Sequence, residues 1–281
     1  MNIGNVSILD LRVGGMPVQS VYDGEHLVWT RESPAGDYWG LCFTAEEANS
    51  TVSMTAETGA PAVTLEYSTN ANDWSPFTVG STTVTLANVG DKVWMRAGSG
   101  GNTTMTQNEK VNKFNLTGKI AASGNVMSLL DGEQQLSTIS SNLCFYRLFA
   151  DLTALVSAPD LPATTLANSS YNAMFIRCTG LITPPAELPA LIAPDACYRG
   201  MFENCSSLST APVISATSTS QWCFASMFKG CSNLVTPPPE LPAKSLANYC
   251  YQNMFDCCIS LSVSPELPAT SLANYCYSGM F

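Results

Sequence analysis

A recurring Met-Phe pair constrains the possible folds of this chain more than any other feature of its sequence. The pair, once Leu-Phe, recurs between residue 144 and the last residue, with its phenylalanines at Phe149, Phe175, Phe202, Phe228, Phe255 and Phe281. The intervals between successive phenylalanines alternate, in the order 26, 27, 26, 27, 26, and we refer to the two values as the short and the long interval. A period this regular predicts stacked, near-identical turns of chain.

Other residue types keep register with that phenylalanine. Five residues before it stands a cysteine, once a serine, at Cys144, Ser170, Cys197, Cys223, Cys250 and Cys276. A leucine follows six residues after it, at Leu155, Leu181, Leu208, Leu234 and Leu261, and a proline follows ten residues after it. The extra residue of the longer repeats falls beside that proline, in Pro184-Pro185-Ala186 and Pro237-Pro238-Pro239, where a loop absorbs it.

The spacing within one repeat predicts its local structure. Cys250, Met254 and Cys258 are spaced i, i+4 and i+8, which predicts a short helix with one apolar face. The leucine that follows predicts a short strand, and the Pro-Glu-Leu-Pro-Ala segment predicts an extended return. Ordering one repeat costs roughly 26 to 50 kcal/mol of backbone entropy, against roughly 2 kcal/mol for each buried side chain. One repeat cannot fold alone, so the repeats must stack.

The run from Met254 to Leu261, with an aromatic residue followed by cysteine and leucine, resembles the BspA-like leucine-rich repeat. Residues 265–281, Pro-Glu-Leu-Pro-Ala-Thr-Ser-Leu-Ala-Asn-Tyr-Cys-Tyr-Ser-Gly-Met-Phe, look like the longer variant found in surface and phage proteins of gut bacteria. The resemblance covers about half of the chain. It implies a leucine-rich-repeat-like solenoid with short helices, and a role in adhesion or recognition rather than one particular ligand.

The remainder of the chain predicts β modules in front of the array. Residues 1–34 read as a β-meander and attachment segment, residues 35–117 as an immunoglobulin-like β-sandwich, residues 118–143 as a connector and N-terminal cap, and residues 144–281 as about five repeats ending in mid-repeat. Seven short segments of the sandwich have strand character, at 41–45, 51–55, 62–68, 74–79, 82–86, 92–97 and 113–116. The expected fold is therefore mainly β.

Residues 11–29, Leu-Arg-Val-Gly-Gly-Met-Pro-Val-Gln-Ser-Val-Tyr-Asp-Gly-Glu-His-Leu-Val-Trp, look like short N-terminal segments of phage tail and other virion proteins. Strands this short are marginal alone, so we expect them to pack on the next domain or on a partner chain. Because the chain stops at Phe281 before the cysteine and leucine of that repeat, we expect the natural protein to continue or another chain to cover this end.

Charge and hydropathy limit the classes of partner that we expect for this chain. The net charge is -10, and the 12 Lys and Arg residues are too few for a surface that follows nucleic-acid phosphates. No stretch approaches the roughly 18 apolar residues of a membrane span, so we expect no membrane insertion. The first ten residues lack a basic region and a continuous apolar run, and we therefore expect no signal peptide.

Eleven cysteines raise the question of disulfides or metal. All but Cys42 lie in the array, and the two column cysteines of one repeat would be too far apart on a helix for a bridge. We favour a ladder of buried free thiols over disulfides, and both over zinc, because the only adjacent pair is Cys257-Cys258 with no histidine nearby in sequence.

The sequence offers little support for catalysis, and we predict no enzyme, no cofactor and no metal. The only histidine, His26, lies in the predicted meander with no nucleophile motif around it. Four acids beside the prolines form one column, at Asp160, Glu187, Glu240 and Glu266. They are interpreted as a solvated turn, with a cation site or a site for a basic receptor as the alternative. A carbohydrate-active enzyme ranks third among the functions, because carboxylate pairs cannot be located from sequence.

The working surface is predicted on the array itself. Side chains that vary on the fixed frame are the candidate receptor-facing residues: Arg199, Gln252, Asn253, Thr183, Thr210 and Thr236. We predict a phage virion structural protein of the tail, baseplate or head fibre. Its N-terminal β modules would contact other virion proteins, and its array would contact a host-surface protein or glycan. The chain could also form a homo-oligomer. The alternative is a bacterial cell-surface adhesin.

Overall fold

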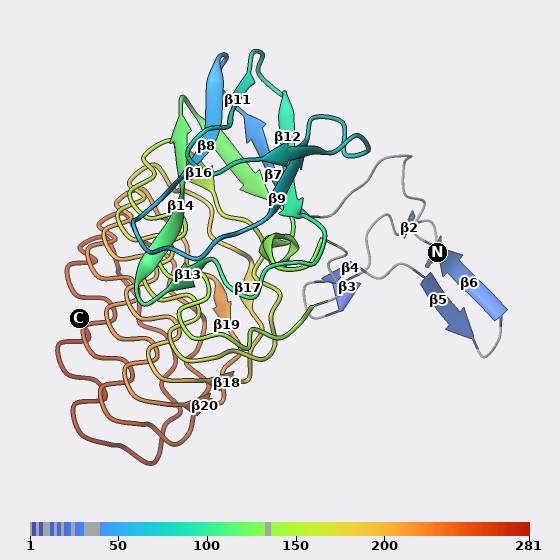
Figure 1. The fold of residues 1–281 in the computed structure, drawn as a ribbon. Helices are drawn as coiled ribbons and strands as arrows, with labels where there is room; N and C mark the ends of the chain where they lie inside the picture. The colour runs from blue at the N-terminus through green and yellow to red at the C-terminus, as the bar shows by residue number, and fades with distance from the viewer. Residues whose placement is uncertain are drawn as a thin grey trace.

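The computed structural model describes residues 40–132 and 136–281, together with six short strands between residues 2 and 30. This part of the chain is mainly β, with its strands divided among several sheets. Its one helical segment is the 3-10 helix η1 (Val126–Leu129), whose first turn is capped by the side chain of Asn125. A pair of sheets lies at one end of a column of stacked coils, which extends from it to the C-terminus (Figure 1).

The six N-terminal strands form three antiparallel pairs. These are β1 (Asn2–Ile3) with β2 (Val6–Ser7), β3 (Arg12–Val13) with β4 (Met16–Pro17), and β5 (Ser20–Asp23) with β6 (His26–Thr30). They lie within the meander predicted for residues 1–34, and the rest of that segment is outside the described residues. Its boundary and its role in attachment stay predictions.

Two sheets follow, built from β7 (Leu41–Ala45), β8 (Ser50–Ala56), β9 (Leu65–Ser68), β10 (Ser75–Phe77), β11 (Thr83–Leu86), β12 (Lys92–Ala97), β13 (Thr106–Gln107), β14 (Lys110–Thr117) and β15 (Ile120–Ser123). One sheet has the order β10-β9-β12-β7-β15 and continues into β16 (Leu155–Ser157), and the other has the order β11-β8-β14-β13. Residues alternate between buried and more exposed along β8 and β12, so each strand turns one face to the core. The rings of Phe43 and Phe114 meet between the two sheets at 5.0 Å. The seven strands predicted from sequence all overlap observed strands.

The array consists of six coils, which we number 1 to 6 by their phenylalanines, Phe149, Phe175, Phe202, Phe228, Phe255 and Phe281. One side of each coil is extended chain. In coil 3 it contains β17 (Glu187–Leu188) and β18 (Ile192–Ala193), and in coil 4 it contains β19 (Val213–Ile214) and β20 (Ser218–Thr219). Neighbouring coils run parallel, so β17 pairs with β19 and β18 with β20. We call this the strand side, and the opposite stretch around the phenylalanine the turn run.

The turn run corrects a prediction, because it is a series of consecutive turns and not a short helix. Its N–H groups alternate between two kinds of partner. In coil 2 the N–H of Met174 donates to the carbonyl of Tyr171, three residues back, and the N–H of Phe175 donates to Met201 in coil 3. Every second N–H therefore bonds to the next coil, whereas a helix would satisfy all of them internally.

The helix prediction failed because a spacing of four residues also fits this turn run. A left-handed residue recurs at every fourth position, as at Ser169, Ala173 and Arg177 in coil 2. The backbone pattern therefore repeats every four residues and returns positions i, i+4 and i+8 to the same face. Cys197, Met201 and Cys205 illustrate this, since all three are completely buried. The strand predicted after the leucine is present as β16 in coil 1 and is reduced to single bridges in the coils that follow.

Aromatic rings stack in register through the array. The six phenylalanines form one continuous stack with ring centroids 5.3–5.7 Å apart and nearly parallel planes. A second stack beside it contains Phe145, Tyr171, Tyr198, Phe224, Tyr251 and Tyr277. Each ring in the middle of a stack covers two others, so every coil contributes to the core of both of its neighbours.

The sheets and the array share one core. Phe114 of β14 stacks on Phe149 at 5.1 Å and so adds a further ring to the phenylalanine stack. The N–H of Phe114 donates to the carbonyl of Leu148, and that of Ile120 donates to Ala154. Strand β14 therefore covers coil 1 in the position of a preceding coil. The predicted connector and cap, residues 118–143, contributes β15, which runs parallel to β16.

An ion-pair cluster crosses the same junction. The carboxylate of Asp151 accepts hydrogen bonds from Lys113 in β14 and from Arg177 in coil 2. Partial burial alone would raise the pKa of Asp151. The two hydrogen bonds and the positive charges outweigh that effect and lower the pKa to about 2, from an ordinary value of 3.8. The negative form of Asp151 is thus stabilised by folding.

Removing one ring from the middle of the stack should destabilise the whole array. Phe202 is completely buried between Phe175 and Phe228. We expect Phe202→Ala to lower the free energy of unfolding by about 3–5 kcal/mol, measured by urea denaturation. Ile259 is 84% exposed, and the matched change Ile259→Ala should alter it by less than about 0.5 kcal/mol. Equal effects of the two changes would contradict the stacked core.

Acid should weaken the junction through Asp151. Because its folded pKa is depressed, its contribution to stability is complete above about pH 4 and is lost as the pH falls toward 2. We expect Asp151→Asn to lower the thermal midpoint at pH 7 and to flatten the loss of stability between pH 4 and pH 2, measured by circular dichroism. If the stability of the two proteins fell equally between pH 4 and pH 2, Asp151 would not be responsible for the loss.

Candidate functional site

Hydrogen bonding on the strand side alternates along the array. Where two phenylalanines are separated by the short interval, the strand sides of their coils are bridged. Ser157 pairs with Thr183 between coils 1 and 2, and Thr210 pairs with Thr236 between coils 3 and 4. Glu240 likewise pairs with Glu266 between coils 5 and 6. These interfaces are closed on both sides.

Where the interval is the long one, the backbone hydrogen bonds of the described residues join the turn runs and not the strand sides. Between coils 2 and 3, hydrogen bonds such as Tyr171 N–H to Cys197 C=O join the turn runs, but among the described residues no backbone hydrogen bond joins 161–167 to 188–194. Between coils 4 and 5, Thr219 partly closes the corresponding gap: its hydroxyl accepts the N–H of Ala247 and donates to the carbonyl of Ser245. We call the first of these interfaces the open seam.

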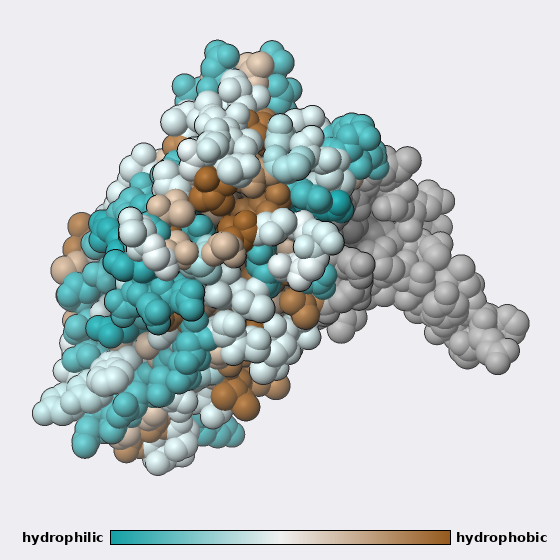
Figure 2. Space-filling model, in the orientation of Figure 1, coloured by the Kyte–Doolittle hydropathy of each residue, from teal (hydrophilic) through white to brown (hydrophobic). Residues whose placement is uncertain are grey.

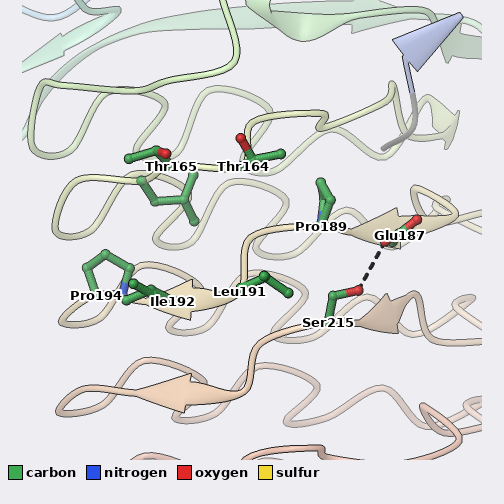
Figure 3. Close-up of a pocket in the computed structure, with 9 residues that line it drawn as sticks. Thr164, Thr165, Glu187, Pro189, Leu191, Ile192, Pro194 and Ser215 are labelled. Atoms are coloured by element: carbon green, nitrogen blue, oxygen red, sulfur yellow. Dashed lines mark hydrogen bonds between the residues drawn. The ribbon is translucent and has the colours of Figure 1, made fainter. Parts of the chain in front are cut away.

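A groove of about 510 Å³ follows the open seam, and Figure 3 shows how its residues lie. Thr164 and Thr165 of coil 2 stand on one side. Leu191 and Ile192 of coil 3 stand on the other, and Ser215 of coil 4 lies at one end. The remaining lining residues are Leu166, Glu187, Pro189 and Pro194. The lining is therefore mostly aliphatic.

The exposed apolar pair of this groove departs from the pattern of the array. Leu191 is 59% exposed and Ile192 is 63% exposed. The residues at the same two positions of the other repeats are polar: Thr164-Thr165, Thr217-Ser218, Lys244-Ser245 and Thr270-Ser271. Figure 2 shows an apolar patch over the part of the array that holds β18, among paler surface. Large exposed apolar side chains at positions that are otherwise polar indicate a contact surface.

The one charged side chain among the lining residues of the groove is acidic. The Ser215 hydroxyl donates a hydrogen bond of 3.0 Å to the carboxylate of Glu187, which fixes its orientation at one end of the groove (Figure 3). Asp195 directly follows Pro194 and is exposed. No Lys or Arg is among the lining residues.

The sequence prediction missed this groove. It compared the residues that precede each phenylalanine and those that follow each leucine, and the groove uses neither set. A signal was present in the sequence, because only one repeat has Leu-Ile at two positions where the other repeats have polar residues. The opening between the coils could not be read from composition, since it depends on which hydrogen bonds the long interval leaves unmade.

The predicted receptor-facing threonines lie elsewhere on the strand side. Thr183, Thr210 and Thr236 are all exposed, and Thr210 and Thr236 are paired across coils 3 and 4. Arg199 is exposed on the turn run of coil 3. Within the described part of the chain, no hydrogen bond or ion pair joins Arg199 to these threonines, so the structure does not gather them into one site.

Gln252 and Asn253, the other predicted contact residues, are only half exposed. Asn253 has a left-handed φ of 52° and is one of the turn-forming positions of coil 5. Its side-chain oxygen lies where a Cβ of Gly279 would be, so it packs on the backbone of coil 6. Asn253 is therefore held by the frame of the array as well as facing outward.

The turn run carries a row of alternating charges, at Asp151, Arg177, Glu203, Lys229 and Asp256. Lys229 pairs with Asp256 at 2.7 Å, and this hydrogen bond raises the pKa of Lys229, with a further contribution from the charge of Glu203. Each cation thus lies beside an acid of a neighbouring coil. The row is a chain of surface ion pairs, worth little individually.

The acid column on the strand side is interrupted. Val213 takes the acidic position in coil 4, between Glu187 and Glu240. Across residues 40–132 and 136–281, no three His, Cys, Asp or Glu side chains are placed to hold a metal ion together. His26 lies in β6, and its side chain is outside the described part.

The cysteines form the predicted ladder of free thiols. Ten of the eleven are buried and Cys257 is exposed. In one column each thiol donates to a phenylalanine carbonyl of the preceding coil, as from Cys205 to Phe175 and from Cys231 to Phe202, both at 3.0 Å. Burial raises the pKa of Cys178 to about 12 and that of Cys250 to about 11. The thiols of Cys178 and Cys250 therefore stay protonated at neutral pH and do not act as nucleophiles.

Comparison with known proteins adds no relative to this picture. No protein-family model, no curated protein and no solved structure matches the chain. Among the described residues, no helix is long and apolar enough to span a membrane.

Thiol labelling should separate Cys257 from the ladder. We expect iodoacetamide at pH 8 to alkylate Cys257 in the native protein while the ten buried cysteines react only after unfolding, because they are inaccessible to the reagent. Mass spectrometry of labelled peptides would measure this, with urea-unfolded chain as the control that labels all eleven. Native labelling of column cysteines as fast as Cys257 would contradict the packing.

Proposed function

We propose that this chain is a non-enzymatic structural protein of a phage virion, in the tail, baseplate or head fibre, that displays its array for recognition of the host surface. The observation that carries the proposal is the groove of the open seam, where Leu191 and Ile192 stand exposed on a frame whose other repeats are polar at these positions. A rigid scaffold with a localised apolar contact surface suits binding better than catalysis.

The array fits this role because its frame and its surface are separated. The buried phenylalanine, methionine, cysteine and leucine columns hold every coil in place, so the outward positions can change without loss of the fold. Repeat proteins use such surfaces for recognition. We propose that the array is a leucine-rich-repeat-like solenoid, supported by the resemblance of its repeats and by their parallel stacking.

The two sheets support a role in attachment. We propose that residues 35–117 form an immunoglobulin-like sandwich, on the basis of two facing sheets of short strands. Together with the strand pairs of residues 2–30, they would contact other virion proteins at the end of the chain opposite the array. The partners of the array would be a host-surface protein or glycan, and the chain could form a homo-oligomer.

Mass spectrometry can decide where the protein resides. Purified extracellular phage particles and washed bacterial envelopes from a producing culture would be digested and searched for peptides from residues 40–117 and from the array. We expect enrichment in particles at a level comparable to other virion components.

Enrichment in envelopes instead would overturn the virion assignment and favour the bacterial adhesin. A known capsid protein and a known outer-surface protein, measured in the same two fractions, would show that the separation was clean.

A further inference from the structure

We propose that the groove of the open seam binds an extended protein segment that carries aliphatic side chains at its centre and Lys or Arg on its flanks. This inference rests on the proposed recognition function and names the chemistry of the partner. It makes the partner a protein rather than a glycan, and it places the contact at coil 3.

The lining favours protein side chains over sugar rings. Leu166, Leu191 and Ile192 are aliphatic, and the groove has no aromatic ring among its lining residues. Sugar rings commonly pack against aromatic faces, which this lining does not supply. Aliphatic side chains fit it, and its volume of about 510 Å³ lies within the roughly 300–1,000 Å³ typical of ligand sites.

The charges favour a basic segment. Glu187 lies at one end of the groove, and its hydrogen bond from Ser215 holds it there. Asp195, which directly follows Pro194, is exposed and accepts a hydrogen bond from the N–H of Gln221. Lysines or arginines that flank an aliphatic centre would meet Glu187 and Asp195. The net charge of -10 would draw the same partner in from a distance.

The basic residues near the groove in sequence lie on the turn runs and not on the strand side. Between residues 148 and 228 the only basic residues are Arg177 and Arg199, and both belong to turn runs. Arg177 is bonded to Asp151, away from the groove. The strand side of this stretch therefore brings no positive charge of its own that would repel a basic segment.

The groove is also pre-formed, which lowers the cost of binding. Pro189 and Pro194 bracket the Leu191-Ile192 pair, and proline fixes the backbone on either side of it. Coil 3, which carries the pair, is anchored by β17 and β18, and these strands pair with β19 and β20 of coil 4. A partner need not order this part of the array on binding.

Fluorescence polarisation with labelled peptides tests the chemistry on the full chain. The probes are Lys-Lys-Leu-Ile-Leu-Lys-Lys, the same core flanked by glutamates, and the lysine peptide with a Ser-Ser-Ser core. We expect the first probe to bind at least about tenfold more tightly than the other two. Equal binding of the glutamate probe, or of the serine-core probe, would overturn the proposal.

Variants of the array locate the contact. Leu191→Thr/Ile192→Ser copies the polar residues of the other repeats and should weaken binding of the first probe by about tenfold or more. Glu187→Gln should weaken it by about threefold and reduce its dependence on salt. The matched control Thr270→Ala/Ser271→Ala changes the same positions in coil 6 and should leave binding unchanged. Because Leu191 and Ile192 are exposed, the double variant should keep the wild-type thermal midpoint.

Failure of this inference can be told from failure of the proposed function. If the double variant and wild-type chain bind host envelopes and the first probe equally, the groove assignment falls while recognition by the array stands. If the peptide results are as expected but the protein is absent from phage particles, the groove stands and the virion assignment falls.

Discussion

Every second N–H in the turn run of a coil is donated to the next coil, and the rest of the array depends on this division. A helix would place its backbone hydrogen bonds within one coil. Here the bond from Phe175 to Met201 exists only when two coils lie side by side. The backbone therefore imposes the stacking, and the buried side chains make it favourable.

The side-chain columns follow from that backbone. Because every second N–H of a turn run bonds to the next coil, each phenylalanine lies above the next, and the rings stack nearly parallel. Cysteine fits its column because a thiol is small and can donate to a carbonyl of the preceding coil, as Cys205 does to Phe175. The same register brings Phe114 onto the stack, so a strand of the sheets takes the place of a missing coil.

Sequence reasoning succeeded where a pattern had one physical explanation. The phenylalanine period implies stacking, and the segments of alternating residues between 41 and 117 overlap the observed strands. It failed where two structures share a pattern. A spacing of four residues fits both a helix and a turn run with a left-handed residue at every fourth position, and residues such as Ala173 and Arg177 give no sign that they will adopt that conformation. The groove could not be predicted because it arises from hydrogen bonds missing between coils 2 and 3, although Leu191 and Ile192 marked its place.

The alternation between the short and the long interval makes the array a repeat of coil pairs. Phe175 and Phe228 are separated by one interval of each kind, as are Phe202 and Phe255, and each such step spans one strand-side interface with backbone bridges and one without them. Genetic gain or loss of a single coil would place two interfaces of the same kind in succession, whereas exchange of two consecutive coils would leave the order intact. The natural module for recombination in such a gene is therefore the coil pair, and each exchanged module would bring its own seam.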